Sequence, residues 1–237
     1  MARTQWRRIA GFRVVVSWPQ NGTVSAPKRN IVHTLRSRVA GFMGLVLVGG
    51  GVTAIIAGIG AQHHAPRPGG TASGRIGRLS GLSLPRSVPV SVRIPAIDVN
   101  AQLLRLGLNR DGTMQVPALP AYAADAAWYK YSVTPGQVGA SVIEGHIDSY
   151  SGPAVFYRLG ALHPGDRVDV RLADGVTATF QVTGVRQYRK AEFPAKVIYA
   201  ANGYAALRLI TCGGAFDTAT GHYLGSTVVF ASLVSAR

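Results

Sequence analysis

The sequence predicts a mainly β domain that follows a single transmembrane helix. From about residue 91 onward, short β-branched and apolar runs alternate with turn residues roughly every ten positions. Helical periodicity is scarce in this part of the chain, and one uncharged apolar stretch lies upstream of it. Many short strands within roughly 145 residues favour a β-barrel or a β-sandwich, which we assign to residues 91–237.

The apolar stretch, residues 39–61, reads VAGFMGLVLVGGGVTAIIAGIGA and contains no charged residue. Its 23 residues match the roughly 20 that a membrane-spanning helix needs. Arg29, Arg36 and Arg38 precede it, so the positive-inside rule places the N-terminus in the cytoplasm. A cleaved signal peptide is the alternative, but the stretch is longer than the usual apolar core of such a peptide. We therefore expect a single-pass protein of the cell membrane, held in the lipid bilayer by residues 39–61, with an extracytoplasmic domain.

Two segments flank the predicted anchor. Residues 1–38 are basic and lack a clear period, which is typical of a cytoplasmic tail. Residues 62–90 are rich in Gly, Pro and Ser and contain no acid, as expected of a linker between membrane and domain. His63 and His64 have no other ligands nearby in the sequence, so we predict no metal site there. The single cysteine, Cys212, excludes an intrachain disulfide and a cysteine-based metal site, and we expect no cofactor.

The formal net charge of +15 first suggests a nucleic-acid partner. The charge is unevenly distributed, however. Residues 1–97 hold thirteen basic and no acidic residues, whereas residues 98–237 hold twelve basic and ten acidic ones. Because the predicted β domain is nearly neutral, we expect no nucleic acid to bind it.

Individual elements follow from local patterns. Residues 90–108 and 226–234 contain β-branched runs typical of strands, and LRLITC (207–212) is a further strand. The clearest hairpin lies in residues 167–185, where apolar and polar residues alternate on both sides of an Asp-Gly turn. The sequence PAYAADAAWYKY, residues 120–131, is the best candidate for a short helix.

Two residues suggest nucleophilic chemistry. Cys212 ends an apolar run and is followed by two glycines, and His146 likewise follows an apolar run and a glycine. A thiol becomes a useful nucleophile when a histidine holds or removes its proton, and the amide of Gly213 is positioned to stabilise an oxyanion. From the residues alone, a buried structural cysteine with an unrelated surface histidine is the commoner explanation of such a pattern. Asp148 and Asp217 are weaker candidates for orienting the histidine.

These motifs resemble the sortase family. The sequence TCGG follows an apolar strand, and GHIDSYSGPAVFYRLGALHPGD precedes it, with His146 lying 66 residues before Cys212. The continuation LRLITCGGAFDTATGHY, followed by VVFASL, resembles class F sortases, which are common in Actinobacteria. The resemblance covers about residues 88–237. Papain-like and L,D-transpeptidase enzymes differ in the order or spacing of these two residues.

The resemblance implies an eight-stranded sortase β-barrel with short helices and, by analogy, a monomeric catalytic domain. It further implies a transpeptidase in which Cys212 attacks an LPXTG-like sorting signal and forms a thioacyl intermediate. His146 would be the general acid and base, and a peptidoglycan precursor amine would be the acceptor. Residues 185–204 would form the loop that shapes the signal-binding pocket. Candidates for the apolar wall of this pocket are Phe193, Pro194, Val197, Ile198 and Tyr199. The alternative role of these residues is to pack the loop onto the barrel.

The sequence departs from the family at one position. Sortases carry an arginine about a dozen residues after the cysteine, but no Arg or Lys lies between Cys212 and Arg237. Replacement donors are Arg208, which shares a strand face with Cys212 by parity, together with His222 and Ser226. Loss of one such donor typically lowers the rate on the order of 10²–10³-fold. A sortase-like pseudo-enzyme, or an envelope β-domain that only binds peptides, is therefore the alternative function.

Overall fold

The computed structural model describes residues 65–69, 81–200 and 203–237. Within these ranges the chain is mainly β, with few and short helices. The strands are β1 (Pro89–Ile94), β2 (Val99–Leu106), β3 (Ala126–Tyr129), β4 (Gly139–Gly145), β5 (Asp148–Ser149), β6 (Gly152–Pro153), β7 (Arg167–Leu172), β8 (Thr177–Arg189), β9 (Ala205–Asp217) and β10 (His222–Ala236). The helices are η1 (Pro95–Ile97), η2 (Leu159–Ala161), η3 (Lys190–Glu192) and α2 (Ala195–Ile198).

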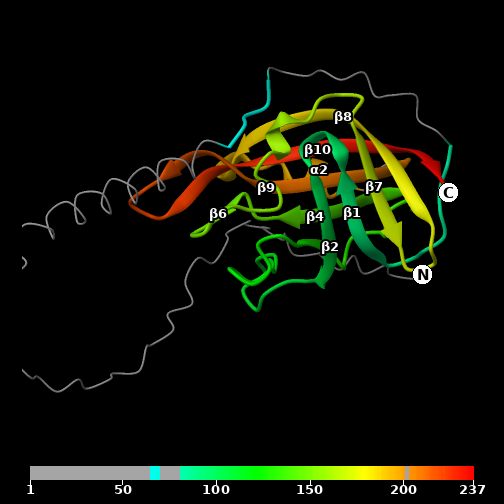
Figure 1. Cartoon of the computed structure of the whole chain (residues 1–237), viewed down its shortest axis with the longest axis horizontal. Coiled ribbons are helices and arrows are strands. Elements are labelled where there is room, and N and C mark those ends of the chain that lie inside the picture. Colours follow the sequence, from blue (N-terminus) through cyan, green and yellow to red (C-terminus); the bar gives the residue numbers. More distant parts are fainter. Residues whose placement is uncertain (1–64, 70–80, 201–202) are drawn as a thin grey trace, which may run out of the picture.

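Eight of these strands close into a barrel, which confirms the predicted fold (Figure 1). Their order around the barrel is β1-β2-β3-β4-β9-β10-β8-β7. All neighbouring pairs are antiparallel except β2 with β3 and β4 with β9, which are parallel. Strands β9 and β10 form a long hairpin that reaches beyond the rest of the barrel in Figure 1. Strands β5 and β6 form a separate two-stranded sheet directly after β4.

The predicted β7–β8 hairpin is present. Val168 pairs with Phe180 and Val170 with Ala178, and all four side chains lie in the barrel core. The turn between the strands contains Gly175 at φ 89°, a left-handed conformation that glycine adopts without steric cost. Alternation of apolar and polar residues therefore identified both strands and their register correctly.

The prediction of a short helix in residues 120–131 is wrong. The chain makes turns up to Ala124 and then forms β3, in which Trp128 is 1% exposed and packs in the core. The alanine-rich composition suggested a helix, but pairing with β2 and β4, which buries Ala126, Ala127 and Trp128, decides in favour of a strand.

The loop expected over residues 185–204 begins later than predicted. Strand β8 continues to Arg189, because its backbone pairs with β10 as far as Gly225. The segment that follows, whose described part is residues 190–200, contains η3 and α2. We call it the β8–β9 segment.

The segment expected to be a linker contacts the barrel in its described parts. Leu84 and Val88 pack against the core, and the backbone N–H of Leu84 donates to the carbonyl of Gly136. The carbonyl oxygen of Pro66 lies so close to Gly160 that a Cβ there would be 2.1 Å away. Strand β1 begins at Pro89, two residues before the expected start of the domain.

The predicted tail and transmembrane helix, residues 1–38 and 39–61, lie outside the described residues, as do His63 and His64. Among the helices that the structure describes, none is long and apolar enough to cross a membrane.

Candidate active site

Cys212 lies on the outer face of β9. The side chains of Leu207 and Leu209 point into the barrel core, whereas Ile210 belongs to a cluster on the outside. We call this second group the outer cluster; its buried members are Val142, Ile198, Ile210 and Val228. Because side chains alternate along a strand, Cys212 shares the outer face with Ile210. The thiol-bearing residue is 8% exposed.

His146 directly follows β4, the parallel neighbour of β9. The last pair of residues in this register is Glu144 with Ile210. His146 and Cys212 each lie two residues beyond this pair, at the same end of two adjacent strands. Adjacent strands lie about 4.8 Å apart, so the fold places both predicted catalytic residues at one end of this part of the barrel wall.

The hydrogen bond of His146 selects its tautomer. Nε2 lies 2.7 Å from the carbonyl oxygen of Pro117, which only accepts, so Nε2 carries the proton. Nδ1 is then the basic nitrogen of the ring. Burial lowers the pKa of His146 below its ordinary value, and the bond to Pro117 opposes this effect. The imidazole is therefore neutral at pH 7 and able to accept a proton.

The pKa of the Cys212 thiol is raised to about 12. Burial is the main cause, the charge of Lys190 opposes the rise, and the charges of Asp148 and Glu144 add to it. At neutral pH the resting pair is consequently a thiol and a neutral imidazole, not a thiolate and an imidazolium ion. A proton must move from sulfur to nitrogen as the sulfur attacks.

Asp148, a weaker candidate for orienting the histidine, interacts with a tyrosine. The hydroxyl of Tyr223 donates a hydrogen bond to Oδ2 of Asp148, and both residues are buried. Tyr223 also forms a buried apolar cluster with Ile147 and Cys212. The Tyr223–Asp148 pair therefore supports the wall of the site beside the thiol. Asp217 accepts bonds from Ala219 and Thr220 within a turn, the ordinary role of a loop aspartate.

Lys190 is the functional candidate that sequence reasoning missed. It is half-buried at the start of η3, and its positive charge lowers the pKa of Cys212. Arg189 pairs with Gly225, and Ser226 pairs with Cys212, so the end of β8 lies two strands, or about 10 Å, from the cysteine. The family pattern places the cation after Cys212, and nothing in the local sequence marks Lys190.

Three glycines leave room for close packing around the cysteine. A Cβ on Gly213 would lie 2.6 Å from the hydroxyl of Thr227, and one on Gly225 would lie 2.8 Å from the carbonyl oxygen of Tyr188. Gly214 adopts φ 83°, which favours glycine. Next to them, the β9–β10 register shifts between Tyr223 and Gly225, a bulge of the kind that re-aims side chains near active sites.

The replacement donors predicted from sequence are placed very differently. Arg208 is on the outer face, as parity predicted, but it lies four residues, or about 13 Å, before Cys212. Its guanidinium stacks on Phe230, with Cζ 4.7 Å from the ring centroid. His222 pairs with Asp217, five residues or about 16 Å beyond Cys212. Only Ser226 is directly beside the cysteine, and its buried hydroxyl has no hydrogen-bond partner.

The predicted pocket residues divide between two roles. Phe193 packs against both the Cys212 cluster and the outer cluster, so it borders the site. Ile198 is fully buried and attaches the β8–β9 segment to the barrel, whereas Val197 is 61% exposed. Tyr199 contacts the ring of Phe193, with centroids 6.4 Å apart. Pro194 is half-buried and directly precedes α2.

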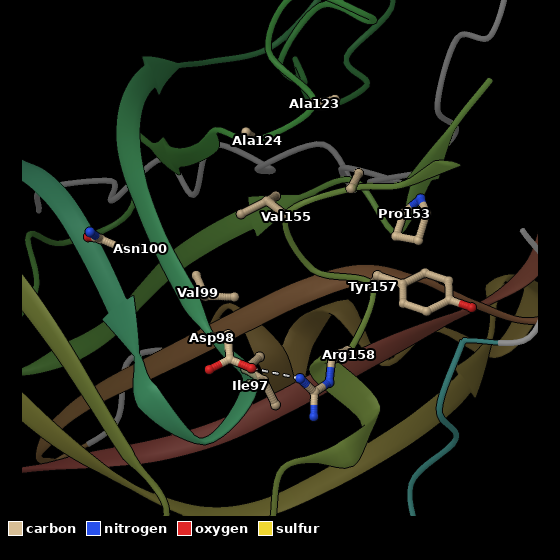
Figure 2. A pocket seen from close by; sticks show the side chains of 11 residues that line it. Ile97, Asp98, Val99, Asn100, Ala123, Ala124, Pro153, Val155, Tyr157 and Arg158 are labelled. Atoms are coloured by element: carbon tan, nitrogen blue, oxygen red, sulfur yellow. Dashed lines mark hydrogen bonds and ion pairs between the residues drawn. The ribbon is translucent and has the colours of Figure 1, made fainter. Parts of the chain in front are cut away.

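A surface hollow of about 400 Å³ lies beside the site (Figure 2). Tyr157, which also packs against the Cys212 cluster, forms part of its wall. Its charged groups pair with each other, since Arg158 donates to Asp98 at 2.8 Å.

A second, smaller hollow borders Gly213 and is lined in part by Ala65, Pro66 and Arg67. In the part of the chain that the structure describes, no three His, Cys, Asp or Glu side chains gather as a metal site.

The profile of the Sortase domain family matches residues 92–234, more than half of the chain. The chain belongs to the sortase family. Sortases are cysteine transpeptidases, and the described part of this chain contains one cysteine, Cys212. No curated protein sequence matches the chain significantly.

The chain is also similar to solved sortase structures at low sequence identity. Sortase A from Corynebacterium diphtheriae is 19% identical, with a TM-score of 0.48, over 64% of this chain and 62% of that one. Sortase A from Listeria monocytogenes is 21% identical, with a TM-score of 0.46, over 65% and 90% of the two chains. Sortase C1 from Streptococcus agalactiae is 19% identical, with a TM-score of 0.47, over 62% and 67%.

Proposed function

We propose that this sortase is an active cysteine transpeptidase in which Cys212 is the nucleophile and His146 is the general acid and base. One observation supports the proposal: the last β4–β9 pair, Glu144 with Ile210, lies two residues before both His146 and Cys212, at the same end of adjacent parallel strands of a sortase barrel. The lowered pKa of His146, caused mainly by burial, keeps its ring available as a base at neutral pH.

The chemistry follows from this neutral pair. Sγ of Cys212 attacks the carbonyl carbon of the scissile peptide bond while Nδ1 of His146 takes the thiol proton. The imidazolium ion then protonates the leaving nitrogen, the C–N bond breaks, and a thioacyl enzyme remains. The acceptor amine next gives a proton to His146 and attacks the thioester. The C–S bond breaks, and the proton returns to the sulfur.

Two groups support stabilisation of the negative charge that develops on the carbonyl oxygen. The backbone of Gly213 directly follows the nucleophile, and Lys190 supplies the positive charge that acts on Cys212. We propose that Lys190 performs the role for which other sortases use an arginine on the last strand. Its site on the β8–β9 segment makes this cation part of the same element that borders the substrate.

The finer assignment rests on the sequence motifs. We propose a class F sortase of the actinobacterial type that recognises an LPXTG-like sorting signal and transfers it to a peptidoglycan precursor amine. Residues 1–38 are the proposed cytoplasmic tail, residues 39–61 the bilayer anchor and residues 62–90 the connection to the extracytoplasmic domain. This arrangement keeps the reaction next to the cell wall.

Mass spectrometry of the full-length protein in detergent tests the proposal. After incubation with an LPXTG-type peptide, we expect a thioester adduct on Cys212 and its discharge by an added amine. Cys212→Ala abolishes the adduct, and His146→Ala reduces its rate. Absence of an adduct in the wild type, or an adduct that survives Cys212→Ala, contradicts the enzymatic function. Retained peptide binding without an adduct indicates the alternative, a peptide-binding domain without turnover.

A further inference from the structure

A buried carboxyl group lies two residues before His146. Glu144 is on β4, is 1% exposed, and is one of only two glutamates in the chain. Neither of its carboxyl oxygens has a hydrogen-bond partner. A buried polar group without a partner costs stability, so its presence calls for a physical explanation.

The nearby buried cation does not satisfy Glu144. Arg208 pairs with Val142, two residues before Glu144, and lies on the same outer face. Its guanidinium is directed elsewhere, since it stacks on Phe230 and donates from Nη1 to the carbonyl of Leu207 at 3.1 Å. Among the ion pairs of the described residues, none joins Arg208 to Glu144. The carboxyl group therefore keeps its full capacity to accept hydrogen bonds.

Two tyrosines accompany the carboxyl group. Tyr129 ends β3 and Tyr199 caps α2, and their rings lie 6.3 Å apart at an angle of 66°. The hydroxyl of Tyr199 is buried and, like the carboxyl oxygens of Glu144, has no hydrogen-bond partner. Glu144 pairs with Ile210 of the outer cluster, and Tyr129 and Tyr199 both pack against that cluster, so the three residues lie on the same part of the outer face.

This combination has the chemistry of an ammonium site. A primary ammonium group carries three N–H donors and no acceptor, which matches two carboxyl oxygens and one phenol oxygen. Aromatic faces attract a cation, with a strength that increases as water is excluded. The adjacent ring already holds one, because Nζ of Lys130 lies 5.2 Å from the ring centroid of Tyr131. An apolar group would leave the oxygens unpartnered, and an anion would be repelled.

The location connects these groups with the reaction. Glu144 pairs with Ile210, two residues before Cys212, so it lies about 7 Å along the strands from the thiol. This distance corresponds to about two residues of an extended peptide. Tyr129 contacts Tyr131, with ring centroids 5.6 Å apart, and Tyr131 is 65% exposed. The group is thus one ring away from solvent.

We propose that Glu144, Tyr129 and Tyr199 form a subsite for a primary ammonium group carried by a molecule that reacts at Cys212. The connection with a reacting molecule rests on the proposed function. The ammonium group belongs either to a lysine of the sorting signal near the cleaved bond or to a second amino group of the acceptor. Burial raises the pKa of Glu144 well above its usual value, and pairing with a cation opposes this rise, so binding of an ammonium group favours the ionised carboxylate.

Carbon-13 NMR of the full-length protein, labelled at the glutamate side-chain carboxyl, tests binding without requiring turnover. The two glutamates give two signals, and exposed Glu192 is the internal control. On titration with n-butylammonium chloride, we expect the Glu144 signal to move towards the chemical shift of an ionised carboxylate. The Glu192 signal should change no more than it does in a control titration with sodium chloride. Tyr199→Phe weakens the response. Absence of a Glu144 response in the wild type overturns the proposal.

Kinetics then distinguish the two sources of the ammonium group. Signal peptides carry lysine or its neutral analogue norleucine at each of the four positions before the cleaved bond, and acceptors carry one or two amino groups. We expect a preference on the order of tenfold or more for lysine at one position, or for the diamine, because hydrogen bonds to charged groups are strong. In Glu144→Gln the preference falls to within about twofold.

An NMR response without either preference overturns the link to the reaction. If no adduct forms with any peptide, the proposed function fails, and the NMR response alone decides whether the ammonium site exists.

Discussion

At the scale of single residues, the protonation state of Cys212 decides how the site works. Its pKa, raised to about 12 mainly by burial, leaves a thiolate fraction of only about 10⁻⁵ at pH 7. We expect alkylation by iodoacetamide to be slow at neutral pH and to accelerate about tenfold per pH unit between pH 8 and pH 11. Because Cys212 is the only cysteine, its labelling rate is measured directly by mass spectrometry. A rate that is already high and constant from pH 6 to pH 8 would instead indicate a thiolate–imidazolium pair.

The same neutral pair determines how activity depends on pH. The pKa of His146 is lowered, chiefly by burial, so the ring becomes protonated only below its ordinary range. We expect kcat/KM for thioester formation to fall in acid, with an apparent pKa below about 6.5, and to stay level from neutral pH to pH 9. A pH series in the same peptide assay measures this. An acid limb above pH 7 contradicts a buried, neutral His146.

At the scale of elements, β10 shows why an arginine is not simply restored beside the cysteine. A side chain at Gly225 collides with the carbonyl oxygens of Tyr188 and Gly213, and Ser226 is fully buried. Leu224 is 51% exposed at the bulge, so it accepts a longer side chain without repacking. Its neighbour Gly225 pairs with Arg189, which directly precedes Lys190. A cation at position 224 therefore approaches the location of Lys190.

This geometry gives a rescue experiment for Lys190. We expect Lys190→Met to lower the rate of thioester formation on the order of 10²-fold, since a charge that stabilises the developing anion is lost. It also raises the pKa of Cys212 measured by alkylation, because Lys190 lowers it in the wild type. Leu224→Arg restores part of the rate in the Lys190→Met background. Lys196→Met, an exposed lysine on the same segment, is the matched control. If Lys190→Met equals the wild type in both measurements, another group provides the charge.

The elements also show which parts of the site were predictable. The glycine-flanked strand ends pointed to Cys212 and His146 as candidates, but their place at the same end of two adjacent strands depends on parallel pairing between residues 66 positions apart in the chain. No local pattern encodes that pairing. Lys190 precedes Cys212 and is brought near it only by the β8–β10–β9 order. Glu144 directly precedes the quoted histidine motif, but glutamate is normally exposed, so its burial was not predictable from residue type.

At the scale of the whole molecule, alternation and turn signals predicted a barrel or a sandwich without deciding between them. Closure depends on β1 pairing with β7, and these strands are separated by five others in the chain. The choice of the eight-stranded barrel came from resemblance to sortases, and the structure confirms it. Composition was misleading for β3. Its alanines suggested a helix, but the segment is a strand whose Trp128 packs in the barrel core. Alternation thus predicted the β7–β8 hairpin, whereas pairing with β2 and β4 decided the structure of β3.

The free energy of unfolding should record the buried carboxyl group. The pKa of Glu144 is higher in the folded than in the unfolded chain because of burial. The folded state therefore binds more protons between these two pKa values, and stability falls as pH rises through this window. Each pKa unit of difference corresponds to about 1.4 kcal/mol once both states are ionised. His146 has the opposite sign, since its lowered pKa reduces stability as pH falls below about 6.5.

A comparison of variants isolates the contribution of Glu144. We expect Glu144→Gln to gain stability relative to the wild type between pH 5 and pH 8, because the amide cannot ionise. Glu192→Gln, at an exposed position, shows no such gain. Chemical denaturation followed by the fluorescence of buried Trp128 measures this, with Trp6 and Trp18 replaced by Phe in every protein. Measurements remain below pH 9 because the raised pKa of Cys212 reduces stability above that value. If the difference in stability between Glu144→Gln and the wild type does not change with pH, Glu144 has the same pKa in the folded and unfolded chains. That result would contradict a buried carboxyl group without hydrogen-bond partners.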